Sequence, residues 1–126
     1  MAADSCAAPD ASFTSFLAKF KNDKQFRETR LVLPLQFSST DPSGTTKEAL
    51  SLEEIRKRNM ALILGDKDAR ELKGSEGALC ESKPIIKKSR ASFGQYSCGT
   101  DVYSDAFYFV RRNGCWMLER VAVSGG

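Results

Sequence analysis

Histidine is absent from this chain of 126 residues. Without imidazole, the chain lacks the commonest general base and every Ser–His or Cys–His nucleophile pair. The cysteines include no Cys-x-x-Cys pair, which argues against a structural zinc site. No glycine-rich phosphate loop, dinucleotide-binding fingerprint or EF-hand spacing occurs. We therefore expect no metal, no cofactor and no enzymatic activity.

Long apolar runs are also missing, and none approaches the roughly 18 residues that a membrane-spanning helix needs. The net charge is only +3, and the sequence has no dense basic stripe with interleaved aromatic residues of the kind that nucleic-acid binders carry. The length suits one domain with its own core. We expect a single globular domain that neither inserts into a membrane nor binds nucleic acid.

Two pairs of carboxylates remain as candidates for acid–base chemistry. Glu53 and Glu54 are adjacent on an expected helix, so their side chains should point about 100° apart. Asp101 and Asp105 flank the tripeptide Val-Tyr-Ser, where we expect them to cap or turn a loop. Neither pair predicts an active site.

The four cysteines are even in number and widely spaced: Cys6, Cys80, Cys98 and Cys115. In a small domain without metal-binding spacing, this favours disulfides and hence an oxidising compartment, either the periplasm or the extracellular space. The alternative is four buried reduced thiols in a cytosolic protein. Three pairings are possible, and the sequence does not choose among them. A bridge between Cys80 and Cys98 would close a loop of about 19 residues and contribute about 3 kcal/mol.

The first residues, Met-Ala-Ala-Asp-Ser-Cys-Ala-Ala-Pro, are of the small kind found next to a signal-peptidase cut. This favours an exported chain whose signal peptide is absent from the given sequence. We expect residues 1–10 to form a flexible N-terminal arm and residues 11–126 to form one α+β domain.

Two main helices are expected. The first covers residues 11–22, where Phe13, Phe16, Leu17 and Phe20 recur at helical spacing, and Asp10 or Ser12 can cap it. The second begins with the capping-box pattern of Ser51 and Glu54 and should run to about residue 64, ending near Gly65. A short helix over residues 66–73 can follow.

Strands are expected over residues 26–37, 85–89 and 91–97. In the first, Leu31, Leu33, Leu35 and Phe37 alternate, which predicts one buried face, and Pro34 predicts an edge position or a bulge. Residues 38–46 are rich in Ser, Thr, Pro and Gly and are expected to form a polar loop.

The clearest pattern is a β-hairpin around Asn113-Gly114, a pair suited to a type I′ turn. With Arg112 opposite Cys115, one face carries Phe107, Phe109, Trp116 and Leu118, with Arg111 and Arg120 at its ends. The other face carries Ala106, Tyr108, Val110, Cys115, Met117, Glu119 and Val121. We expect the first face to be covered by the N-terminal helix.

The fold class that follows is α+β: an N-terminal helix and a second helical segment packed on a mainly antiparallel curved sheet that ends in a hairpin. This order, with Phe-Tyr-Phe followed by Asn-Gly-Cys-Trp, resembles the cone-shaped folds related to nuclear transport factor and cystatin. The overall profile, small, exported and without catalytic motifs, resembles the periplasmic immunity proteins that protect bacteria from type VI secretion cell-wall amidases.

The resemblance implies a non-enzymatic protein that inhibits a secreted cell-wall hydrolase by placing a polar loop in its active-site cleft. Two segments, residues 39–45 and residues 96–103, combine turn residues with hydroxyl groups suited to such a contact. The candidate partner-binding residues are Ser39, Thr40, Asp41, Ser43, Thr45, Tyr96, Ser97, Thr100, Asp101 and Tyr103. A homodimer is left open.

Two rival functions remain open. A small-ligand binder or enzyme would use the interior of the cone, which we expect to be lined by Tyr108, Val110 and Met117. A structural subunit of an envelope assembly would need an exposed apolar patch or an oligomer.

Overall fold

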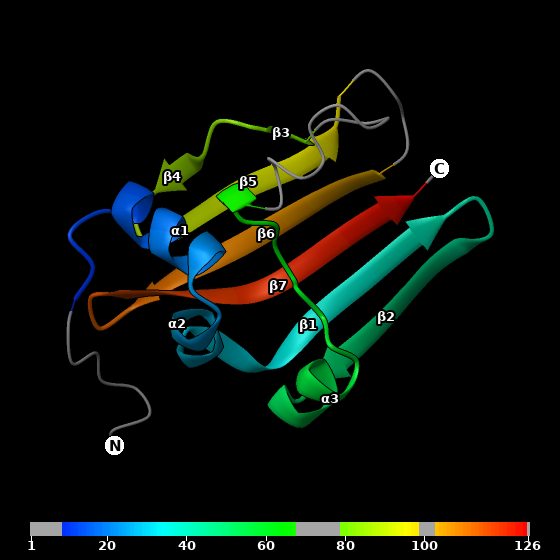
Figure 1. Cartoon of the computed structure of the whole chain (residues 1–126), viewed down its shortest axis with the longest axis horizontal. Coiled ribbons are helices and arrows are strands. Elements are labelled where there is room, and N and C mark those ends of the chain that lie inside the picture. The colour runs from blue at the N-terminus through cyan, green and yellow to red at the C-terminus, as the bar shows by residue number, and fades with distance from the viewer. Residues whose placement is uncertain (1–8, 68–78, 99–102, 126) are drawn as a thin grey trace.

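A computed structural model describes residues 9–67, 79–98 and 103–125 of the chain. Its helices lie on one face of a curved, open sheet (Figure 1). The described helices are α1 (Phe13–Asn22), α2 (Lys24–Thr29) and α3 (Leu52–Lys57). The described strands are β1 (Leu31–Asp41), β2 (Gly44–Leu50), β3 (Leu79–Glu81), β4 (Ile85–Lys87), β5 (Arg90–Ser97), β6 (Tyr103–Arg112) and β7 (Cys115–Gly125).

The sheet has the strand order β2-β1-β7-β6-β5-β3, and β4 also pairs with β5. All pairings are antiparallel except that of β1 with β7, which is parallel. The predicted α+β class with a mainly antiparallel sheet is therefore confirmed. In the described part of the chain, no helix is long and apolar enough to span a membrane.

Helix α1 covers the sheet as its phenylalanine spacing predicts. Ser12 caps it, because its hydroxyl accepts the Ser15 N–H at 3.1 Å. Phe16 and Phe20 are buried and meet Phe109 edge to face, each with ring centroids 5.6 Å apart. Such pairs stabilise by more than the area they bury, so they fix the position of α1 on the sheet.

The predicted hairpin forms with the expected pairing of Arg112 and Cys115, and Asn113 and Gly114 both have positive φ. Its aromatic face is buried as predicted. A bulge follows, because Tyr108 pairs with Arg120 and Phe109 pairs with Leu118, which leaves Glu119 as an extra residue.

Because of the bulge, two residues that follow it lie on the opposite face of the sheet from the one predicted. Val121 pairs with Phe107 and is fully buried in the core, not on the opposite face. Arg120 pairs with Tyr108 and stacks on its ring, so it lies on the face away from the helices rather than at the end of the core face.

The prediction of a strand over residues 26–37 is wrong for residues 26–30. Asp23 accepts the Phe26 N–H and caps α2, so the strand begins only at Leu31. The predicted bulge at Pro34 is confirmed, since the pairing of β1 with β7 shifts between Leu31 and Gln36. The interruption breaks the alternation, and Leu33 is 45% exposed.

Residues 38–46 do not form the expected loop. They continue β1 to Asp41 and begin β2 at Gly44, which makes a tight hairpin. The helix expected to reach residue 64 ends at Lys57, because Asn59 adopts a left-handed conformation with φ of 53°. Most of the further helix expected over residues 66–73 lies outside the described residues.

Cys80 and Cys98 form a disulfide, and Cys115 is disulfide-bonded as well. Cys6 lies outside the described residues. Disulfides persist in oxidising environments, so the bond supports the expected extracytoplasmic setting over the alternative of four reduced thiols. The expected N-terminal arm also lies mostly outside the described residues, but Asp10 is held by its N–H, which donates to the Gly114 carbonyl at 3.0 Å.

Candidate functional site

The two segments predicted to contact a partner lie at the same end of the sheet, with β7 and β6 between β1 and β5. Cross-strand pairing aligns one row of hydroxyl side chains over five strands, on the face away from the helices: Thr45, Thr40, Ser124, Ser104 and Tyr96. On the opposite face, the adjacent row is Thr46, Ser39, Val123, Asp105, Gln95 and Glu81. We call these two rows, with the turn between β1 and β2, the polar end of the sheet.

The turn between β1 and β2 is held by its own side chains. The Asp41 carboxylate accepts the Ser43 N–H at 2.8 Å and the Ser43 hydroxyl at 2.5 Å. These bonds lower the pKa of Asp41, with the hydroxyl contributing most. The hydroxyls of Thr40 and Thr45 lie 2.9 Å apart. The tip is therefore exposed yet pre-ordered, which reduces the entropy lost when a turn binds a partner.

The predicted contact residues of the second segment, residues 96–103, do not share one environment. Tyr96 is 41% exposed and lies in the hydroxyl row, as predicted for a contact residue. Ser97 is buried, so it is unavailable to a partner. Thr100, Asp101 and the side chain of Tyr103 lie outside the described residues. The described residues therefore place Tyr96 in the same row as Thr40 and Thr45, and they exclude Ser97.

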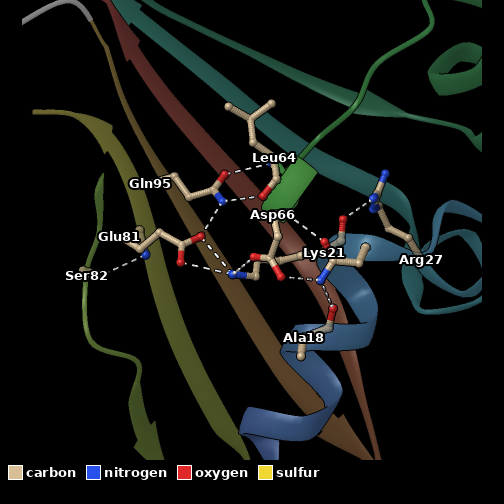
Figure 2. Close-up of polar contacts among 10 residues, drawn as sticks. Ala18, Lys21, Arg27, Leu64, Asp66, Glu81, Ser82 and Gln95 are labelled. Atoms are coloured by element: carbon tan, nitrogen blue, oxygen red, sulfur yellow. Dashed lines mark hydrogen bonds and ion pairs between the residues drawn. The ribbon is translucent and has the colours of Figure 1, made fainter. Parts of the chain in front are cut away.

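Gln95 fixes the helix-facing side of the polar end (Figure 2). It is only 1% exposed, and its amide donates to the Leu64 carbonyl at 2.7 Å while its side-chain oxygen accepts the Leu64 N–H at 2.9 Å. The same amide donates to Glu81 at 2.8 Å. A buried amide that satisfies three partners positions the segment after α3 against β5.

Lys21 links α1 to this side of the sheet (Figure 2). Its ammonium donates to both carboxylate oxygens of Glu81 at 3.1 Å and lies 3.7 Å from Asp66. The Lys21 side chain is only 12% exposed, which strengthens these contacts relative to a surface ion pair. The cluster therefore ties α1, β3 and the segment after α3 together.

Asp105 lies beside this cluster, paired across the strands with Gln95. It belongs to strand β6 and not to the loop expected from the sequence. Burial raises the pKa of Asp105, and no hydrogen bond or ion pair to a described residue offsets that cost. A half-buried carboxyl group without a partner among the described residues is a candidate for binding a hydrogen-bond donor or exchanging a proton.

The Lys21–Glu81–Gln95 cluster was not identifiable in the sequence. Lys21 lies 60 positions from Glu81, and Gln95 resembles any polar residue of a half-exposed strand. Among the described residues, no group of three or more His, Cys, Asp or Glu side chains could hold a metal ion.

The three residues that were expected to line the interior of the cone lie elsewhere in the structure. Tyr108, Val110 and Met117 alternate with the core residues Phe107 and Phe109 and their cross-strand partners, so they lie on the face away from the helices. This corrects the prediction that they line the interior of the cone.

The structure is similar to solved proteins described as NTF2-like. An NTF2-like protein from Bacteroides fragilis NCTC 9343 matches 96% of this chain with a TM-score of 0.60 and 18% identity, and the chain spans 50% of that protein's length. An NTF2-like protein of unknown function from Silicibacter pomeroyi DSS-3 matches 88% of this chain and 86% of its own, with a TM-score of 0.50 and 9% identity. No protein-family model matches the sequence, and no curated protein matches it. At these identities the likeness establishes the fold, and that fold hosts unrelated functions.

Proposed function

We propose that this protein is a non-enzymatic, extracytoplasmic binding protein that contacts a protein partner through the polar end of the sheet. The observation that carries the proposal is the alignment of Thr45, Thr40 and Tyr96 in one row, although they come from two distant segments. The Cys80–Cys98 disulfide supports the compartment.

The more specific proposal is inhibition of a secreted bacterial cell-wall amidase, as an immunity protein would provide. The pre-ordered turn at Asp41 and Ser43 would enter the active-site cleft, while Tyr96 would supply an aromatic contact at its rim. Hydroxyl groups and backbone amides would bond the cleft in place of substrate.

The test is lysis of purified peptidoglycan by a panel of secreted amidases, including any encoded beside this protein, followed by turbidity. We expect one amidase to be inhibited at stoichiometric amounts of protein. The variant Thr40→Ala/Thr45→Ala/Tyr96→Ala should raise the inhibition constant at least tenfold, whereas Ser15→Ala/Lys57→Ala, on exposed helical positions, should not change it. If both variants inhibit equally well, the polar end is not the contact surface. If no amidase in the panel is inhibited, the amidase proposal is wrong.

Asp105 favours a second candidate, a small-ligand binder or enzyme acting on the helix-facing side of the sheet. The Asp105 carboxyl group could bond a ligand there, and burial raises its pKa, which favours proton exchange with the ligand. A metabolite library should then raise the Tm of the protein but not of Asp105→Asn. If no metabolite shifts the Tm of the unsubstituted protein, this candidate fails.

A further inference from the structure

The sheet face away from the helices carries a groove that runs across the strands. Its central hollow, of about 440 Å³, lies over β4 to β7 and is lined by Ile85, Ser92, Tyr108 and Arg120, among others. A hollow of about 200 Å³ adjoins it at Ile85, Ser92 and Tyr108 and adds Lys83. Another of about 200 Å³ adjoins it at Arg120 and extends to β1 and β2. Because each smaller hollow shares lining residues with the central one, we call the three together the groove.

The centre of the groove is Arg120, which the bulge of β7 turns onto this face. Its guanidinium lies 3.9 Å from the centroid of the Tyr108 ring. This stacking orients the guanidinium but does not neutralise its charge. Among the described residues, Arg120 has no carboxylate partner.

Cations outnumber available carboxylates along the whole groove. Lys47, Lys83 and Lys87 also line it, and none of them pairs with a described carboxylate. The lining carboxylates are Glu48, bound to Arg58 at 3.0 Å, and Glu119, bound to Arg90 at 2.6 Å. Within the described ranges, four positive charges therefore have no carboxylate partner and are available to a ligand.

The β4 end of the groove also carries an exposed apolar side chain. Ile85 lines the groove and is 58% exposed. An uncovered isoleucine beside a row of cations calls for a partner that carries both acidic and apolar side chains.

We propose that this groove binds an extended acidic peptide segment that also carries apolar side chains. From β2 to β4 the groove crosses five strand spacings, about 24 Å, which an extended segment of about seven residues would span. Its carboxylates would pair with Arg120 and the lysines, and an apolar side chain would cover Ile85. A uniformly polar polyanion would leave Ile85 uncovered, and a second copy of this face would oppose the same cations.

The probe is a fluorescein-labelled nine-residue peptide with six glutamates and three leucines, and binding is followed by fluorescence anisotropy over 50–300 mM salt. We expect saturable binding that weakens with salt. Lys47→Glu/Arg120→Glu should weaken it at least tenfold. Ile85→Ser should weaken it severalfold without changing the salt dependence, because that contact is apolar.

The matched control is Lys57→Glu, which reverses a charge at an exposed position on α3 and should leave the affinity unchanged. If the double reversal does not fold, Lys47→Gln/Arg120→Gln serves in its place and should weaken binding at least threefold. The proposal is overturned if the peptide with lysine in place of glutamate binds equally well, or if the groove variants bind like Lys57→Glu. It is also overturned if an anionic polysaccharide binds more tightly and Ile85→Ser leaves that affinity unchanged, or if the groove reversals abolish a dimer in sedimentation.

Discussion

The carboxylate of Asp10 lies 2.6 Å from the guanidinium of Arg30, and both side chains are about 90% buried. The same carboxylate oxygen accepts the Trp116 N–H at 2.8 Å, while Arg30 donates to the Trp116 carbonyl at 3.2 Å. The Arg30 guanidinium also lies 4.6 Å from the Phe26 ring centroid. The pair therefore joins the residues before α1 to the end of α2 and to β7.

Removing one member of this pair should be strongly destabilising. Asp10→Ala would leave the Arg30 charge and the Trp116 N–H buried without their partner, so we expect a loss of about 3–5 kcal/mol in the free energy of unfolding. Urea denaturation followed by tryptophan fluorescence measures it. Glu53→Ala, at an exposed position on α3, is the control and should change stability by less than about 0.5 kcal/mol. A similarly small effect of Asp10→Ala would show that the pair is not formed.

Gln95→Leu should release the segment after α3. The substitution keeps the size of the side chain but leaves the Leu64 N–H and carbonyl without partners, which should cost about 1–3 kcal/mol. Hydrogen exchange at the Leu64 amide should accelerate more than exchange in β6 and β7. Gln25→Leu, at an exposed position on α2, should change neither quantity. Unchanged protection of Leu64 would contradict the assigned role of Gln95.

Asp105→Asn should stabilise the protein in a pH-dependent way. Burial raises the pKa of Asp105 above its ordinary value of 3.8, so the folded state penalises the ionised form. The penalty is absent below pH 3.8 and develops as the pH rises through the folded-state pKa. We expect a Tm increase of a few degrees at pH 7 and almost none at pH 3.

Asp41→Asn is the matched control with the opposite sign. The Ser43 hydroxyl lowers the pKa of Asp41, so the ionised form stabilises the folded state above pH 3.8, and this contribution disappears as the pH falls through the lowered pKa. Asp41→Asn should therefore lower the Tm slightly at pH 7. Parallel pH profiles for the two variants would contradict the assignment.

The disulfide offers a prediction based on chain entropy. Cys80 and Cys98 are 18 positions apart, so Cys80→Ser/Cys98→Ser should lose about 3 kcal/mol in the free energy of unfolding. The double variant is preferable to a reductant, since Cys115 is disulfide-bonded too. Equal urea midpoints for the variant and the unsubstituted protein would show that the bond does not constrain the unfolded chain.

Local patterns predicted the elements whose causes are local. Phenylalanine spacing identified α1, Ser51 and Glu54 identified the start of α3 through a capping box that is present, and Asn113-Gly114 identified the β6–β7 hairpin. The predictions failed where pairing with strands distant in the sequence determines the secondary structure. Residues 38–40 have the composition of a loop, yet they form strand because β7 and β2 pair with them on both sides.

The candidate site was predictable only in part. Hydroxyl-rich composition pointed to Thr40, Thr45 and Tyr96, but their alignment depends on the register of four strand pairings. The position of Arg120 depends on the bulge at Glu119. Strict alternation from the turn leaves no place for an extra residue, so it put Arg120 at the end of the core face and Val121 on the other face.

The parallel pairing of β1 with β7 also constrains the order in which the chain folds. Leu31 pairs with Leu118, so the centre of the sheet joins segments 87 positions apart in the sequence. Until residues 115–125 are available, β1 has one open edge and α1 has no complete sheet beneath it. Folding therefore waits for the last strand of the domain, and contacts of such long range form slowly.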